Sequence, residues 1–264
     1  MGILNITPDS FYDRGRFFDR DRALERAVEM AEEGADIIDV GGEKAGPGDP
    51  VSVQIEIERV APVIERIRAE LPVVVSVDTF KSEVARVAVA AGAAIVNSIG
   101  GMEDPEMRRV AAESGAAAVV MHIQGRPRVA NPSPVYGNVV DEVVAFLRRR
   151  TQECLDAGIS ADRLVIDPGP GFGKTSAHDI ALLRALERFT LLPYPVLLAV
   201  SRKTFLGDLL GTDAGERLEG SLAVAAWGVM RGVRIIRTHD VRATKRVVAM
   251  TEAVLQTPLE GPGA

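Results

Sequence analysis

The amino-acid sequence predicts an α/β protein whose single domain is a (β/α)8 TIM barrel. Short apolar runs alternate with amphipathic stretches along the whole chain, and a parallel sheet with crossover helices requires this order. The length of 264 residues is close to the roughly 250 residues of a typical α/β barrel. No linker or change of composition divides the chain, so we expect a barrel at residues 1–256 and a flexible tail at 257–264.

Eight apolar runs are the predicted strands. They lie at 3–6, 36–40, 73–77, 94–96, 117–121, 164–166, 196–200 and 233–236. Their number favours a closed barrel over an open, doubly wound sheet, although the order of strands and helices fits both. The first run looks like the second half of a strand, so we expect further residues to precede it.

The segments between the strands have apolar residues at helical spacing. Predicted helices lie at 23–33, 53–70, 84–91, 139–157 and 218–231. Glycine tolerates the left-handed conformation that closes a helix. The glycines that stand before a predicted strand, and so predict where helices end, are Gly34, Gly92, Gly115, Gly158 and Gly232.

The composition limits the partners and the compartment. Lys and Arg number 31 against 37 Asp and Glu, a formal charge of -6, which is too acidic for a general nucleic-acid surface. No apolar run approaches the roughly 18 residues that cross a bilayer, and no signal segment opens the sequence. We expect a cytoplasmic protein that binds neither nucleic acid nor membrane, with its single cysteine, Cys154, as a buried and inert thiol.

A polar residue ends each predicted strand, at the edge where α/β folds place their active sites. The set comprises Asn5, Asp39, Asp78, Asn97, His122, Asp167, Ser201 and the pair Arg237 and His239. One polar residue in such a position usually caps the following helix. Polar residues at all eight strand ends favour a binding pocket.

Two groups within this set differ in charge. Asp78, Asn97 and Asp167 offer oxygen acceptors that suit a planar heterocycle with amino and N–H donors; caps on the following loops are the alternative. Ser201-Arg202-Lys203 and Arg237-Thr238-His239 follow the last two strands, where barrels commonly hold phosphate. A scattered basic surface is the alternative for these, but both runs adjoin strands that should be buried.

The run Pro168-Gly169-Pro170-Gly171-Phe172-Gly173-Lys174-Thr175 ends like a nucleotide-binding P-loop. Proline stands in place of the first required glycine, and the two prolines remove amides that a phosphate cradle would need. We therefore interpret the run as a rigid turn that places Asp167 and Phe172. No spacing of His, Cys or carboxylate residues indicates a tight structural metal site.

The stretch Leu4-Asn5-Ile6-Thr7-Pro8-Asp9-Ser10-Phe11 closely resembles the first signature of the dihydropteroate synthases. Further motifs follow in that family's order and span nearly the whole chain. They are Asp39-Val40-Gly41-Gly42-Glu43, Ser76-Val77-Asp78-Thr79, Met121-His122-Ile123-Gln124-Gly125, Asp167-Pro168-Gly169, Gly171-Phe172-Gly173-Lys174, Ser201-Arg202-Lys203 and Arg237-Thr238-His239-Asp240.

The resemblance implies a transferase of folate biosynthesis that joins 6-hydroxymethyl-7,8-dihydropterin diphosphate to 4-aminobenzoate, uses Mg2+ and forms a homodimer. Carried over by motif, the residues that would hold the pterin, directly or by packing, are Asp78, Asn97, Met121, Asp167, Phe172 and Lys203. Family members are thought to ionise the pterin C–O bond before the amine attacks, so catalysis would be mainly electrostatic.

The remaining family roles fall on the diphosphate and on two loops. Asn5 would bind the metal, while Ser201, Arg237 and His239 would hold the diphosphate. The first loop, with Asp9 and Phe11, and the second, with Pro47, would fold over the site and form the aminobenzoate pocket. The residues assigned to catalysis are Asp9, Lys203 and Arg237.

Two departures from the family separate the functional hypotheses. Where the family has Ser-Thr-Arg-Pro-Gly, this chain has Lys44-Ala45-Gly46-Pro47-Gly48, and Ser98 replaces a common Asp. The lost hydroxyl and guanidinium help to hold aminobenzoate and diphosphate, and Lys44 is a candidate to replace the charge. An active synthase is the first hypothesis, and a related barrel with another acceptor or no catalysis is the second. A cobalamin-linked folate methyltransferase fits less well, because it binds no diphosphate.

Overall fold

The computed structural model describes residues 1–6 and 20–256, and its strands confirm the predicted α/β order. The strands are β1 (Gly2–Asn5), β2 (Ile37–Gly41), β3 (Val74–Asp78), β4 (Ile95–Ser98), β5 (Ala117–Met121), β6 (Leu164–Asp167), β7 (Leu197–Ala199) and β8 (Ile235–Arg237). Each lies within two residues of a predicted strand. The tail predicted at 257–264 lies outside the described residues.

Parallel pairing closes the strands into a barrel. β1 to β6 pair in sequence order, and β7 pairs with β8. Parallel bridges join Ile166 to Val196 and Gly2 to Thr238, so β6 meets β7 and β8 returns to β1. The backbone N–H of Ile3 donates to the carbonyl of Thr238 at 3.0 Å across that last seam. The TIM barrel is therefore confirmed, and the open doubly wound sheet is excluded.

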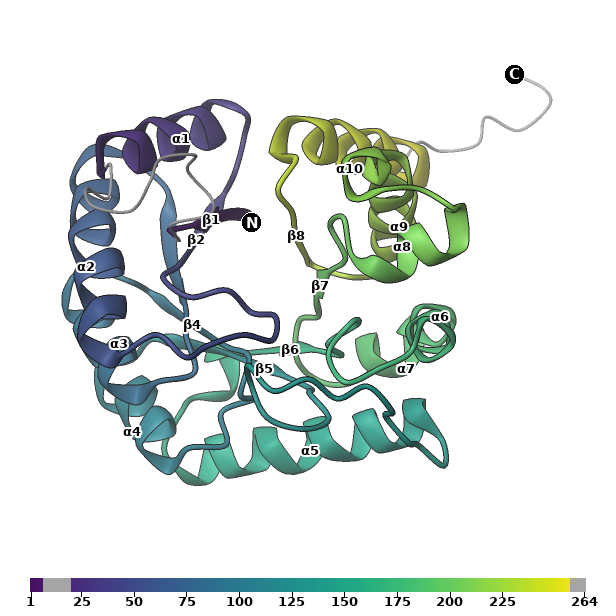
Figure 1. The fold of residues 1–264 in the computed structure, drawn as a ribbon, viewed down its shortest axis with the longest axis horizontal. Helices are drawn as coiled ribbons and strands as arrows, with labels where there is room; N and C mark the ends of the chain where they lie inside the picture. Colours follow the sequence, from purple (N-terminus) through teal and green to yellow (C-terminus); the bar gives the residue numbers. More distant parts are fainter. Residues whose placement is uncertain (7–19, 257–264) are drawn as a thin grey trace, which may run out of the picture.

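The helices form the outer layer around the strands (Figure 1). They are α1 (Arg20–Glu32), α2 (Val53–Glu70), α3 (Ser82–Ala90), α4 (Pro105–Ser114), α5 (Val139–Asp156), α6 (Ser176–Arg184), α7 (Leu186–Thr190), α8 (Thr204–Leu210), α9 (Leu218–Met230) and α10 (Val241–Gln256). The five glycines predicted to end helices all have positive φ angles, which side chains with a Cβ rarely adopt. The predicted helix ends are confirmed.

Two apolar clusters divide the core. The larger one lies between the strands and the helices, and it includes Ala118 and Val120 of β5. The smaller one contains the alternate residue Val119 with Ile95, Val165 and Leu197, all from strands. Since successive side chains of a strand point to opposite faces, this second cluster fills the interior of the barrel. Its partly buried members lie at or just before the starts of their strands, so the carboxyl end of the barrel is left for polar residues.

The single cysteine lies where the composition led us to expect it. Cys154 is buried as predicted, and burial raises the pKa of its thiol to about 11, which keeps it protonated at neutral pH. None of the helices within the described residues is both long and apolar enough to cross a membrane.

Candidate active site

The strand register brings predicted site residues from neighbouring strands together inside the barrel. Asn5 pairs with Gly41, Gly41 with Asp78, and Asp78 with Asn97. All four positions therefore lie on the same face of neighbouring strands, close to the carboxyl ends of those strands. Across the barrel, Met121 pairs with Asp167 in the same way. Residues from distant parts of the sequence thus meet at the carboxyl mouth.

A cavity of about 750 Å³ opens at this mouth. The predicted residues that line it are Asn5, Asp78, Phe172, Ser201, Lys203, Arg237 and His239. A smaller space of about 20 Å³ is lined by Asp78, Asn97, Met121, Asp167, Phe172 and Arg237. The acidic and basic residues that the sequence separated into two groups therefore border connected spaces, because Asp78, Phe172 and Arg237 line both.

Arg237 joins the two groups directly. Its Nε donates to Oδ2 of Asp39 at 2.6 Å, and one terminal nitrogen donates to Oδ2 of Asp78 at 2.7 Å. The side-chain amide of Asn97 donates to the same oxygen of Asp39 at 2.9 Å. The two groups that the sequence distinguished by charge are therefore in direct contact, since the buried carboxylates need a cation close by.

Asp39 lies deeper than the sequence predicted. The predicted strand ended near it, whereas β2 continues to Gly41, so the carboxylate of Asp39 lies inside the barrel with no exposed surface. Its Oδ1 has no hydrogen-bond partner among the described residues. Asp39 lies on the same face of β2 as Gly41, two residues before the strand ends. This alternation was the signal that would have placed Asp39 deeper in the barrel than the residues at the strand ends.

Burial shifts the protonation of the acidic residues. Desolvation raises the pKa of Asp78 to about 7, against the opposing charge of Arg237. Desolvation also raises the pKa of Asp167, whose Oδ1 accepts a hydrogen bond from the backbone N–H of Gly169 at 2.7 Å. Asp78 can therefore exchange a proton near neutral pH and act as either acceptor or donor.

Lys203 supplies a buried amine beside the aromatic wall. Its Nζ donates to the carbonyl of Pro170 and lies 4.4 Å from the ring centroid of Phe172. Burial lowers the pKa of Lys203 to about 8, while Asp167 opposes this shift. The lysine is thus a cation at neutral pH that can lose its proton at moderate cost.

The predicted basic runs contribute fewer charges than their sequences suggest. Both Nε and a terminal nitrogen of Arg202 donate to the carboxylate of Asp240 at 2.8 Å, so this charge is already paired. His239 donates its backbone N–H to Oγ of Ser201 at 3.1 Å, and burial lowers the pKa of its imidazole to about 4. Arg237 is more buried than Arg202 and is likewise paired, with Asp39 and Asp78, while Lys203 lines the cavity as a second buried cation.

The turn after β6 is held by its own lysine. Nζ of Lys174 donates to the carbonyls of Gly169 and Phe172 at 2.8 and 3.0 Å, and it lies 2.9 Å from Nδ1 of His122. A Cβ at Gly169 would lie 1.9 Å from the carbonyl oxygen of His122, and φ is +66° there. The predicted rigid turn is confirmed, and Lys174 serves the turn's own backbone, unlike the lysine of a P-loop.

The family resemblance assigns two loops to the aminobenzoate pocket, and the structure describes the second of them. Asp9 and Phe11 lie outside the described residues, so their predicted roles stay predictions. Pro47 lines a side cavity of about 250 Å³ next to the main one. Ala45 and Gly46 line both cavities, so the altered second loop forms part of the pocket wall.

Asp179 was not identified from the sequence. It is buried on α6, and its Oδ1 accepts a hydrogen bond from the backbone N–H of Gly171 at 2.7 Å. It also lines the main cavity. A lone Asp in the first turn of a helix is common, so the sequence carried no signal that separates this residue from an ordinary helix start.

Comparisons with known proteins agree with this geometry. A family model described as "Pterin binding enzyme" matches residues 1–239. The dihydropteroate synthase of Haemophilus influenzae is 44% identical over 254 residues, which cover 96% of this chain and 92% of that protein. "Inactive dihydropteroate synthase 2" of Mycobacterium leprae is 43% identical and covers 97% of this chain and 90% of its own.

A solved structure shows the same fold. The dihydropteroate synthase of Xanthomonas albilineans, determined with 4-aminobenzoic acid, superimposes with a TM-score of 0.92 at 42% sequence identity, over 97% of this chain and 93% of that chain. The match extends through the strands that form the pocket. With the family model and the full-length relatives, it establishes that this chain belongs to the pterin-binding enzyme family.

Proposed function

We propose that the protein is a dihydropteroate synthase, which condenses 6-hydroxymethyl-7,8-dihydropterin diphosphate with 4-aminobenzoate to give 7,8-dihydropteroate and diphosphate. The observation that carries this proposal is the single mouth at which Asp78, Asn97 and Asp167 lie beside Lys203 and Arg237. Hydrogen-bond acceptors for the pterin and cations for the diphosphate are both present there. The relatives named above support the same reaction.

The buried acceptors would hold the heterocycle. Ionised Asp167 and Asp78 accept hydrogen bonds from amino and ring N–H groups, and Asn97 can both donate and accept. Met121 and Phe172 line the same small space and would pack against the ring faces. Because these groups come from four strands and the turn after β6, the barrel fixes their positions before substrate arrives.

The cations would stabilise the leaving group. As the pterin C–O bond breaks, its electron pair goes to the diphosphate, and the pterin methylene carbon becomes cationic. Lys203 and Arg237 stabilise the anion, whereas the buried carboxylate of Asp167 stabilises the cation. The amine of the acceptor then attacks that carbon and loses a proton, so the reaction needs no side-chain nucleophile.

Asn5 would hold a Mg2+ ion that arrives with the diphosphate. A Cβ built at Gly41 would lie 3.4 Å from Oδ1 of Asn5 and 3.9 Å from Oδ2 of Asp78, so glycine leaves open a space that two oxygens border. Mg2+ prefers oxygen ligands and often takes only one or two from protein. When bound, the ion would neutralise charge on the leaving diphosphate.

Homodimer formation and a cytoplasmic location stay predictions from the sequence. Within residues 1–6 and 20–256, no three His, Cys, Asp or Glu side chains gather as a metal site.

A paralogue without synthase activity is the second candidate. Lys44-Ala45-Gly46 removes the hydroxyl and guanidinium of the family's second loop, and a relative named as inactive is almost as similar as the active ones. Losing an Arg fork in the transition state costs on the order of a few kcal/mol, or a hundredfold in rate. Both candidates would use the same pterin pocket.

One assay separates the candidates. The purified protein is incubated with the pterin diphosphate, Mg2+ and labelled 4-aminobenzoate, and both dihydropteroate and released diphosphate are measured. An active synthase forms the two products in equal amounts. Diphosphate release without dihydropteroate indicates another acceptor, and pterin binding with neither product indicates a binding protein.

A further inference from the structure

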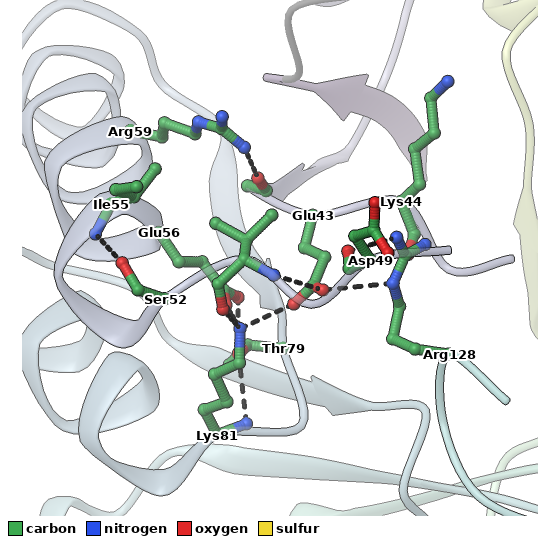
Figure 2. Close-up of polar contacts among 12 residues, drawn as sticks. Glu43, Lys44, Asp49, Ser52, Ile55, Glu56, Arg59, Thr79, Lys81 and Arg128 are labelled. Atoms are coloured by element: carbon green, nitrogen blue, oxygen red, sulfur yellow. Dashed lines mark hydrogen bonds and ion pairs between the residues drawn. The ribbon is translucent and has the colours of Figure 1, made fainter. Parts of the chain in front are cut away.

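The second loop, which joins β2 to α2, is tied down at both ends. A terminal nitrogen of Arg59 donates to the carbonyl of Gly42 at 2.7 Å, where the loop leaves the strand. Ser52 caps α2 by accepting a hydrogen bond from the backbone N–H of Ile55. Between these anchors, residues 43–51 have no regular secondary structure, so their shape depends on other contacts (Figure 2).

Arg128, from the loop after β5, supplies the central contacts. One of its terminal nitrogens donates to the carbonyl of Lys44 at 2.7 Å and to that of Gly46. The other donates to the carbonyl of Asp49 at 2.8 Å. A single guanidinium, with its side chain only 12% exposed, therefore holds three carbonyls of one loop.

A buried charge cluster fixes the position of this guanidinium. Oε1 of Glu43 lies 3.1 Å from Nε of Arg128, and Oε2 of Glu43 lies 2.6 Å from Nζ of Lys81. Lys81 also lies 2.6 Å from Glu56. Two carboxylates and two cations thus balance, as Figure 2 shows, and such mutual pairing is what makes buried charges tolerable.

Gly48 is matched to the arginine. A Cβ at this position would lie 2.6 Å from a terminal nitrogen of Arg128, and the φ of Gly48 is +154°. The backbone N–H of Gly48 also donates to the carbonyl of Arg128 at 3.3 Å. The two loops therefore fit each other through both backbone and side chain.

The second loop forms part of the wall of the main cavity, whereas Arg128, which holds the loop, does not line that cavity. Ala45 lines both the 750 Å³ cavity and the small space beside Asp78 and Asp167, and Gly46 lines the large cavity. Neither residue has a polar side chain that could bind substrate or anchor the loop. Their placement at the mouth therefore depends on the hydrogen bonds made to the backbone by Arg128.

We propose that Arg128 is a positioning residue that holds the second loop as the acceptor-side wall of the active site. That the acceptor is an aromatic amine with a carboxylate rests on the proposed function. The role of Arg128 in holding the loop does not depend on that function. Without the guanidinium, the loop leaves its position and the acceptor loses its wall, while the pterin residues on the barrel strands keep theirs.

The test compares Arg128→Ala and Arg128→Lys with Arg126→Ala. Arg126 lies in the same loop, is exposed and borders the side cavity that Gly46 and Pro47 also line. Its variant therefore removes the same charge beside the second loop but leaves the hydrogen bonds made by Arg128 in place. Hydrogen–deuterium exchange of residues 44–51 is measured together with the KM for 4-aminobenzoate and the affinity for the pterin diphosphate.

We expect Arg128→Ala to speed exchange of the loop and to raise the KM for the acceptor by about tenfold to a hundredfold, since small misplacements have effects of this size. The affinity for the pterin diphosphate should change less than about twofold, and Arg126→Ala should leave loop exchange as it is. Arg128→Lys should give intermediate values, because a compact ammonium cannot hold three carbonyls in a fork.

Unchanged loop exchange in Arg128→Ala, or an equal effect of Arg126→Ala, would overturn the proposal. So would a faster-exchanging loop with an unchanged acceptor KM. If Arg128→Ala fails to fold, Gly48→Ala displaces the guanidinium and must speed exchange of the same residues. Should the wild-type protein prove inactive, the proposed function fails, yet loop exchange and pterin affinity still decide whether Arg128 holds the loop.

Discussion

Asp167 is the residue on which pterin recognition should depend most. Its carboxylate is buried, and one oxygen is already used by the backbone N–H of Gly169. We expect Asp167→Asn to weaken pterin binding by about tenfold to a hundredfold, because a hydrogen bond to a charged group contributes about 1.5–3 kcal/mol. Titration calorimetry with the pterin checks the affinity, and circular dichroism checks the fold. An unchanged affinity would remove Asp167 from the pocket.

Arg237 is expected both to bind the diphosphate and to neutralise Asp39 and Asp78, and one substitution tests both roles. We expect Arg237→Ala to weaken binding of the pterin diphosphate more than binding of the bare pterin, measured by parallel titrations. The substitution also leaves Asp39 and Asp78 without their cation, so the free energy of unfolding should fall by roughly 3–5 kcal/mol. Equal losses for both ligands would count against a role in holding the diphosphate.

The pKa of Asp78 makes pterin binding depend on pH. Burial raises this pKa to about 7, so below pH 7 the carboxyl gains a proton and loses an acceptor for the pterin N–H donors. Affinity for a bare pterin should therefore rise from pH 6 to pH 8, by up to about tenfold per pH unit below the pKa. Calorimetry across this range tests it, with Asp78→Asn expected to remove the rise; an identical slope in that variant would assign it to another group.

At the scale of elements, the altered second loop can accept the family's arginine. A Cβ at Gly46 would meet no atom within 4 Å, and its φ angle is not positive. If the missing guanidinium limits the rate, Gly46→Arg should raise the rate of dihydropteroate formation by about tenfold or more. Gly215→Arg, at an equally open site on the short helix Ala214–Glu216, is the matched control and should leave the rate unchanged.

The elements themselves were largely predictable from the sequence. Short apolar runs and the glycines that end helices carry local signals, and every predicted strand is present. Contacts between elements carry no such signal. Arg128 reaches Lys44 across 84 positions, and nothing in the runs around either residue indicates that pairing, so the sequence could not show how the second loop is held.

At the scale of the whole molecule, closure of the barrel is what creates the site. β8 lies beside β1 only because the ring closes, and this brings a terminal nitrogen of Arg237 to 2.7 Å from Oδ2 of Asp78, 159 positions away. The sequence predicted that these residues share a mouth. It could not predict that they pair directly, because that depends on the depth of Asp39 and on the width of the barrel.

The proposed function requires that one mouth of the barrel holds the pterin among buried acceptors and the diphosphate against buried cations. A crystal structure of the protein with 6-hydroxymethyl-7,8-dihydropterin diphosphate measures this directly. We expect ring nitrogens within hydrogen-bond distance of Asp78, Asn97 and Asp167, and diphosphate oxygens within that distance of Arg237 or Lys203. A ring bound outside the barrel mouth, or a diphosphate bound away from β7 and β8, would contradict it.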